Sequence, residues 1–150
     1  MMNTLFQIEI IKADDKLRQS IVSLLQAEKL PVEDLPSLLD NFFVAIEDNK
    51  VIGVIGLEQY DNCGLLRSMV VNNRYRNKNI ASRLVNELET RAGSLGIDRI
   101  YLLTETAPAF FEKKGYEKIS RTEVPKLIQA STEFSSVCPV SAIAMKKSIA

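Results

Sequence analysis

The sequence contains no histidine, although it is 150 residues long. This absence removes the Ser-His-Asp and Cys-His catalytic arrangements and most zinc sites, because each of them uses an imidazole as base or ligand. Any catalysis by this chain must therefore use carboxylates, tyrosine, lysine, hydroxyl groups, thiols or bound water.

Cysteine, net charge and long apolar runs are also scarce. Cys63 and Cys138 are the only two cysteines, which is too few for a disulfide framework and leads us to expect a cytoplasmic location. The formal net charge is +0, so we expect neither nucleic acid nor an anionic membrane as a partner. The sequence has no apolar run of membrane-spanning length and no signal-peptide pattern.

The length of the chain predicts a single domain. A chain of 150 residues can bury a core of its own. The sequence contains no internal repeat, low-complexity segment or linker. We therefore expect residues 1–150 to form one compact unit.

Apolar residues at helical spacing mark the clearest helix. It covers residues 78–95, and Gly96 stands where a helix C-terminal glycine belongs. Asp14 is a candidate N-cap of an earlier helix that runs to about Lys29. A short helix or irregular arm is expected at residues 30–40, a short helix at residues 107–115 and a helical turn at residues 124–131.

Short apolar runs bounded by turn residues predict the strands. Asn49-Lys50 reads as a hairpin turn. The run KVIGVIGL is apolar at odd and even positions, as expected if both faces of a sheet are covered. The expected fold class is therefore α/β (α+β), with a mixed central sheet and helices on both faces. Expected strands are residues 6–11, 41–48, 50–60, 64–71, 98–105, 116–120 (an edge strand) and 141–148.

A basic loop joins the strand LLRSMVV to the clearest helix. The N-terminus of that helix directs unpaired N–H groups and the positive end of its dipole toward the loop. Together with guanidinium groups, these donors are able to hold a pyrophosphate. A solvated basic turn is the alternative. The basic side chains are Arg74, Arg76, Lys78 and Arg83.

Asparagines stand in this loop where glycines are usual. After glycine, asparagine accepts left-handed backbone most readily. Asn77 and Asn79 are therefore compatible with the path of a phosphate-binding loop. Because their side chains occupy room that glycine leaves for a phosphate oxygen, we expect weaker or altered phosphate affinity.

Three motifs resemble those of the GNAT superfamily of acyl-CoA-dependent N-acyltransferases, over essentially the whole chain. The phosphate motif of that family, Arg/Gln-x-x-Gly-x-Gly/Ala, falls on residues 76–81, where Arg76 and Ala81 match and Asn79 departs. MVVNNRY corresponds to the strand that pairs with pantetheine, and FFEKKGY to the late helix-turn-strand segment. The C-terminal half looks most like a branch of N-acetyltransferases associated with arsenic resistance.

The resemblance implies a GNAT-like, mixed and mostly antiparallel sheet, acetyl-CoA as cosubstrate and no metal. It implies transfer of an acetyl group to the amine of a small molecule, and it allows a homodimer. Backbone groups of Met69, Val70 and Val71 would bind pantetheine and polarise the thioester carbonyl. Residues that would hold the pyrophosphate are Arg76, Asn77, Lys78, Asn79, Ile80, Ala81 and, through its hydroxyl, Ser82.

Acyl transfer to an amine needs a base, an oxyanion donor and a proton for the thiolate. Glu58, at the end of the apolar strand, is the favoured base and would act through water; a solvent-facing strand-end charge is the alternative. Glu105 is the second candidate. Many relatives protonate the thiolate with a tyrosine at the position of Phe111, so here we expect direct attack with water as the acid.

Arg67 interrupts an apolar run, and an unpaired buried charge is costly. We expect it to pair either with a carboxylate such as Glu58 or with the carboxylate of a substrate. The second alternative implies an acceptor that resembles an amino acid. Thr104, Thr106 and Arg121 are candidates to line the same pocket.

Two other functions stay open. The chain could be a catalytically silent acyl-CoA-binding or sensor module, or an α/β nucleotide-binding or partner-binding domain without acyl-CoA. Cys63 and Cys138 could bind a soft ion only if the fold brings them together. We favour the interpretation that they are small apolar core residues.

Overall fold

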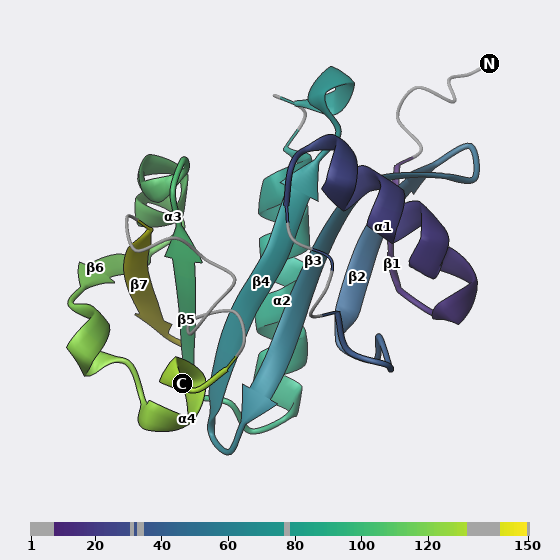
Figure 1. The fold of residues 1–150 in the computed structure, drawn as a ribbon. Coiled ribbons are helices and arrows are strands. Elements are labelled where there is room, and N and C mark those ends of the chain that lie inside the picture. The colour runs from purple at the N-terminus through teal and green to yellow at the C-terminus, as the bar shows by residue number, and fades with distance from the viewer. Residues whose placement is uncertain (1–7, 31, 33–34, 77–78, 132–141, 150) are drawn as a thin grey trace. The chain divides into compact units, whose positions relative to one another are not determined.

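The structure, a computed structural model, describes residues 8–30, 32, 35–76, 79–131 and 142–149 (Figure 1). The strands are β1 (Glu9–Lys12), β2 (Phe42–Glu47), β3 (Lys50–Tyr60), β4 (Cys63–Val71), β5 (Arg99–Thr104), β6 (Glu117–Ile119) and β7 (Ile143–Ser148). The α-helices are α1 (Arg18–Ala27), α2 (Ile80–Ser94), α3 (Pro108–Lys113) and α4 (Lys126–Gln129). Short 3-10 helices are η2 (Asp15–Leu17), η3 (Asn73–Tyr75) and η4 (Arg121–Glu123).

Within the described residues, hydrogen-bonded strands follow the order β1-β2-β3-β4-β5-β7-β6 in a 7-stranded sheet. The pairs β1–β2, β2–β3, β5–β7 and β6–β7 are antiparallel, whereas β4 and β5 are parallel. The expected mixed, mostly antiparallel sheet is therefore confirmed. β6 is the edge strand that the sequence predicted.

The chain divides into two compact units, which are described separately. The first unit contains residues 1–56 and 68–90, and the second contains residues 57–67 and 91–150.

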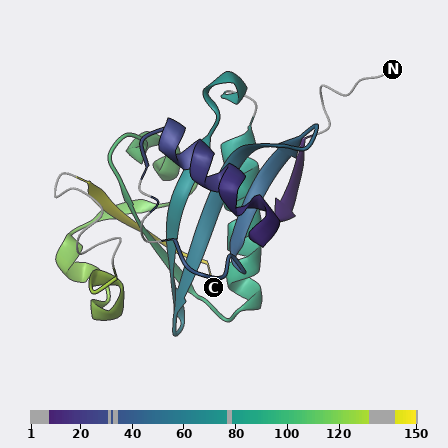
Figure 2. The same cartoon turned by 45° about the vertical axis from the view of Figure 1, so that its right-hand side comes forward.

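In the first unit, α1 and α2 cover opposite faces of β2 and β3 (Figures 1 and 2). The cross-strand pair Val44 and Val54 packs in one cluster with buried residues of α1. The next pair, Ala45 and Gly53, faces α2, where Gly53 closely approaches Leu84. Because successive residues of a strand point to opposite sides, each helix has a face of its own. This confirms helices on both faces of the sheet in this unit.

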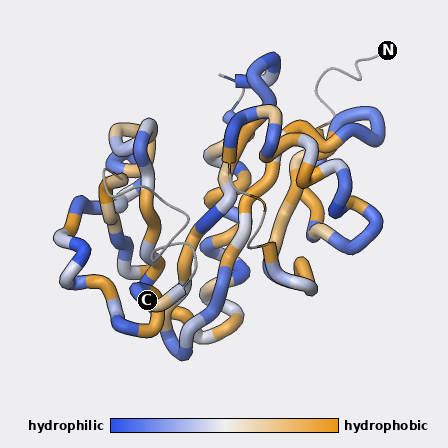
Figure 3. Tube along the Cα trace, in the orientation of Figure 1, coloured by the Kyte–Doolittle hydropathy of each residue, from blue (hydrophilic) through white to orange (hydrophobic). Residues whose placement is uncertain are grey.

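Strand β3 is apolar on both sides, as its sequence predicted, and residues 52–56 are all buried. The β2–β3 turn is hydrophilic (Figure 3). It is formed by Asp48 and Asn49, with φ of 49° and 65°. The turn thus begins one residue before the predicted Asn49-Lys50, and Lys50 already pairs with Glu47 in the ladder. Asparagine and aspartate tolerate positive φ at both central positions of such a turn.

The predicted helix at residues 78–95 is α2, and Gly96 follows it with φ of 80°. Asp14 stands at the N-cap position of η2, but its side chain makes no cap hydrogen bond. The chain instead enters α1 through η2. The described residues between α1 and β2 form an irregular arm, which was one of the two alternatives for this segment.

The second unit is built around β5, β7 and β6. β7 lies between the other two strands, so the last strand of the chain completes the ladder on both sides. Its core cluster includes Leu65, Tyr101 and Ile128. The short helix α3 ends as predicted before Gly115, whose φ is 96°.

Candidate functional site

The loop between β4 and α2 contains a residue in the left-handed conformation. Asn79 has a φ of 64° and lies exposed directly before the first residue of α2. This confirms that asparagine takes left-handed backbone at a position where glycine is usual. Asn77 and Lys78 lie outside the described residues.

The N-terminus of α2 supplies backbone donors to this loop. The helix begins at Ile80, which is buried, and continues with the half-buried Ala81 and Ser82. The N–H groups of a first helical turn have no carbonyl acceptor within the helix, and the dipole adds partial positive charge. An anion at this end of the helix is stabilised by both effects.

Protein groups already engage two basic side chains near the loop. Arg76 Nη2 lies 2.9 Å from Glu28 Oε1. Arg83 Nη2 donates a hydrogen bond to the carbonyl oxygen of Ile8 at 2.8 Å. An anion that uses the Arg76 guanidinium must therefore share it with Glu28 or displace that carboxylate.

Strand β4 contains an irregularity that the sequence did not predict. Ser68 has a φ of 57° although it is buried within the strand. A left-handed residue in a strand redirects the peptide groups that follow it. Those groups belong to Met69, Val70 and Val71, the residues expected to contact pantetheine. Serine is not enriched in left-handed backbone, so the sequence carried no signal for it.

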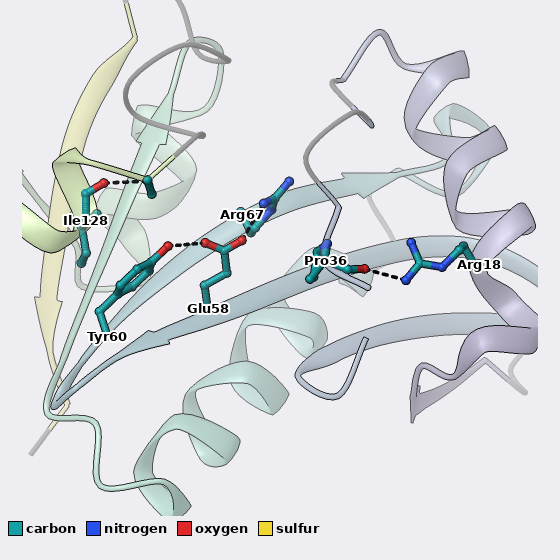
Figure 4. Close-up of polar contacts among 7 residues, drawn as sticks. Arg18, Pro36, Glu58, Tyr60, Arg67 and Ile128 are labelled. Atoms are coloured by element: carbon teal, nitrogen blue, oxygen red, sulfur yellow. Dashed lines mark hydrogen bonds and ion pairs between the residues drawn. The ribbon is translucent and has the colours of Figure 1, made fainter. Parts of the chain in front are cut away.

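In the second unit, Glu58 accepts hydrogen bonds at both carboxylate oxygens (Figure 4). Arg67 Nη1 lies 2.7 Å from Glu58 Oε2, and the Tyr60 hydroxyl donates to Glu58 Oε1 at 2.7 Å. The Arg67 side chain is 2% exposed and that of Glu58 is 23% exposed. Arg67 therefore pairs with Glu58, which was the first of the two alternatives for this residue.

Sequence reasoning missed Tyr60 as a member of this cluster. The available signal was its spacing, because residues two apart on a strand point to the same face. Burial, above all, and also the hydrogen bond and negative charge of Glu58 raise the pKa of Tyr60 from 10.0 to about 12, against smaller opposing effects of Ser131 and Arg67. Tyr60 thus stays a neutral hydrogen-bond donor throughout the neutral range.

The raised pKa of Tyr60 has a measurable consequence for stability. Because its pKa of about 12 in the folded chain exceeds the ordinary value of 10.0, the neutral hydroxyl favours folding below pH 10.0 and this contribution is lost as the pH rises to about 12. In ultraviolet titration, the difference between wild type and Tyr60→Phe should show one tyrosinate forming near pH 12. In Glu58→Gln that pKa should fall only partly, because burial, its largest cause, remains. An ordinary tyrosine titration would contradict this environment.

Other predicted residues are engaged by backbone groups or exposed. Thr104 is buried at the end of β5, where its hydroxyl accepts from the Ala107 N–H at 3.1 Å. Arg121 donates to the carbonyl oxygen of Ala142 at 3.0 Å. Glu105 and Thr106 are exposed in the turn after β5.

Phe111 stands where many relatives place an acidic tyrosine. It is 4% exposed and lies in α3. Its ring makes edge-to-face contacts with Phe110 and Tyr116, at centroid distances of 5.1 and 5.5 Å. Phe111 is therefore a packing residue of the second unit.

Cys63 is a free, buried thiol within the apolar cluster of the second unit, as we had expected of a core residue. Burial raises the pKa of this thiol. Cys138 lies outside the described residues. Within the described ranges, no group of three or more His, Cys, Asp or Glu side chains could hold a metal ion. No helix of the described chain has both the length and the apolar character needed to cross a membrane.

Comparison with known proteins identifies the family. Residues 39–118 match the model of the acetyltransferase (GNAT) domain. The matched segment includes Glu58, Arg67, β4 and the loop that precedes α2. The chain belongs to the GNAT acetyltransferase domain family.

Individual relatives agree with this assignment. An uncharacterised N-acetyltransferase of Chlorobaculum tepidum is 31% identical over 101 residues, which are 67% of this chain and 64% of the relative. An amino-acid acetyltransferase of Photorhabdus laumondii is 26% identical over 95 residues, 62% of this chain and 21% of the relative. The chain thus covers less than two thirds of the length of either relative.

A solved structure supports the fold. The N-acetylglutamate synthase of Neisseria gonorrhoeae, complexed with coenzyme A and N-acetyl-glutamate, matches with a TM-score of 0.81 and 16% identity, over 95% of this chain and 35% of that chain. At this identity the likeness concerns the fold alone. It confirms the expected GNAT-like architecture.

Proposed function

We propose that residues 1–150 form one catalytic domain that transfers an acetyl group from acetyl-CoA to the amine of a small molecule, an amino acid or an analogue. The observation that carries this proposal is membership of the GNAT acetyltransferase domain family over residues 39–118. The amino-acid class of acceptor is supported by the amino-acid acetyltransferase relatives. A closer likeness to the branch associated with arsenic resistance stays a prediction.

The proposed cosubstrate site lies in the first unit. The pyrophosphate would accept hydrogen bonds from backbone N–H groups of residues 76–81 and from the Ser82 hydroxyl. The left-handed Asn79 and the N-terminus of α2 support this role. Peptide groups of residues 69–71, which follow the left-handed Ser68, would bind pantetheine and polarise the thioester carbonyl.

The proposed proton acceptor is Glu58 in the second unit. An ammonium substrate must lose a proton before its nitrogen attacks, and a carboxylate can take that proton through water. Arg67 and Tyr60 would be positioning residues, since each holds one oxygen of Glu58 at 2.7 Å. Glu105 stays the second candidate base, and Thr104, Thr106 and Arg121 stay candidate acceptor-binding residues.

The reaction would proceed by direct attack. The neutral amine forms a bond to the thioester carbonyl carbon, the C–S bond breaks, and CoA leaves as a thiolate. The nitrogen then gives up its remaining surplus proton to water. Because Phe111 has no hydroxyl, we propose that water protonates the thiolate.

Cosubstrate binding is the first test of this proposal. Ligand at about a hundred times its Kd should add about 2.7 kcal/mol to the free energy of unfolding. Acetyl-CoA should therefore raise the melting temperature by several degrees, whereas ATP at the same concentration should not. No shift at millimolar acetyl-CoA would remove the cosubstrate from the proposal.

A catalytically silent acyl-CoA-binding module is the second candidate. The buried Phe111 favours it, because no hydroxyl stands at that position for the leaving thiolate. Turnover separates the two functions: acetyl-CoA should release free thiol when a panel of amino acids and related amines is added. Binding of acetyl-CoA without thiol release for any amine would favour the silent module.

A further inference from the structure

The first unit contains a cavity that the proposed acetyl transfer does not use. Its volume is about 550 Å³, and it lies among α1, the start of β3 and η3. This volume is within the usual range for a small-molecule pocket, about 300 to 1,000 Å³. We call it the α1–η3 pocket.

The walls of the α1–η3 pocket are fixed by hydrogen bonds. The Asn72 N–H donates to the Ile52 carbonyl oxygen at 2.7 Å, which ties the segment before η3 to β3. The Tyr75 hydroxyl donates to Glu47 Oε1 at 2.7 Å, which ties η3 to the β2–β3 hairpin. The ion pair of Arg76 with Glu28 links the residue after Tyr75 to the residue after Ala27, and both of those neighbours line the pocket. The pocket is therefore preorganised by contacts within one unit.

The lining of the α1–η3 pocket combines apolar and polar residues. Of its apolar members, Leu24 and Ile52 are buried, with exposed fractions of 7% and 1%, whereas Ala27 is exposed and Val51 is half-buried. Ser20 and Ser23 add hydroxyl groups from α1, and they share one side of the helix with Leu24 because residues three and four apart are neighbours. A ligand with an apolar body and polar ends fits this distribution.

The charge of the lining is positive. Among the described lining residues, Lys50 and Arg74 are the charged ones, both are exposed, and none is a carboxylate. Glu47 and Asp48 lie in the adjoining hairpin, and Glu47 already accepts a hydrogen bond from Tyr75. A guanidinium group binds planar anions through two parallel hydrogen bonds, and an ammonium group adds a mobile positive charge.

We infer that the α1–η3 pocket is a binding site for a small organic anion, which presents a carboxylate or phosphate to Lys50 and Arg74 and lays its apolar part against Ala27 and Val51. None of the described lining residues belongs to the phosphate loop at residues 76–81, and the inference does not depend on acetyl-transfer activity. The anion is recognised by charge and by hydrogen bonds to the serine hydroxyls.

Backbone NMR of the full chain tests this inference. Succinate and inorganic phosphate serve as probes for the two anionic groups, and neutral succinamide serves as the isostere without charge. Succinate or phosphate should cause saturable shifts of the amides of Ser23, Val51 and Tyr75, and succinamide should not. The tighter of the two anions then identifies the preferred group.

Variants make the test specific to this pocket. Lys50→Ala and Arg74→Ala should each raise the Kd about tenfold, which is the usual effect of losing one charge-assisted hydrogen bond. Ser23→Phe should abolish binding by filling the pocket. Lys12→Ala removes an equal charge from β1, outside the lining, and should leave the Kd unchanged. Shifts confined to residues 79–83, unsaturable shifts, or equal binding of succinamide would overturn the inference.

Discussion

Replacing Gly56 by alanine should lower the free energy of unfolding by about 3 kcal/mol, at the upper end of the range for overpacked cores. A Cβ atom at Gly56 would lie 2.5 Å from two carbon atoms of the Phe42 ring. Phe42 is 1% exposed and is the cross-strand partner of Gly56, so the ring has no free space into which it can move. Urea denaturation followed by circular dichroism measures the change.

Gly93→Ala is the matched control for this substitution. Gly93 lies in α2, and its added Cβ would meet nothing within 4 Å. Alanine should therefore stabilise the chain by up to about 1 kcal/mol, which is the usual difference in helix propensity. Combining Gly56→Ala with Phe42→Leu should recover part of the lost stability, since the smaller side chain relieves the clash. Wild-type stability of Gly56→Ala would show that β2 and β3 do not pack as described.

Local sequence patterns were sufficient to predict most of the elements. The apolar stripe predicted α2 with a first residue two positions from the observed one, and the two-sided apolar run predicted β3. The asparagine at position 79 predicted left-handed backbone because few residue types tolerate it. Each of these signals depends only on residues close together in the chain.

Features that depend on distant residues were not predicted. The sequence of residues 143–148 does not indicate that this strand pairs with both β5 and β6. The left-handed Ser68 and the absence of a side-chain cap at Asp14 likewise reflect surrounding structure that overrides local preference. Propensity is a weak guide wherever tertiary contacts decide the backbone.

The candidate site was predictable to the same degree. The cost of a buried charge predicted a partner for Arg67 and named Glu58 as one of two alternatives, and the structure contains that pair. Thr104 and Arg121 were named as pocket-lining candidates without such a requirement, and backbone groups engage both side chains. The physical requirement for a partner was therefore the better guide.

Replacing Glu58 by glutamine should lower kcat of the proposed acetyl transfer about 100-fold, at the lower end of the usual contribution of a general base. Glutamine has nearly the same shape but cannot take a proton, and its single oxygen replaces only one of the two that accept from Tyr60 and Arg67. The KM for acetyl-CoA should stay unchanged, because this change concerns only the acceptor amine. Steady-state thiol release over a range of pH measures both constants, with circular dichroism to verify folding.

Tyr60→Phe and Arg67→Met separate proton transfer from positioning. Tyr60→Phe removes one hydrogen bond of Glu58 and leaves the carboxylate, so kcat should fall less than about tenfold, as expected for one hydrogen bond. If Arg67 acts only by holding Glu58, then Arg67→Met should lower kcat when it is made in the wild-type background. The same substitution should cause no further loss of kcat when it is added to Glu58→Gln. An increase in the acceptor KM in both backgrounds would instead assign Arg67 to the carboxylate of the acceptor. Full activity of Glu58→Gln would remove Glu58 as the base and direct the same experiment to Glu105.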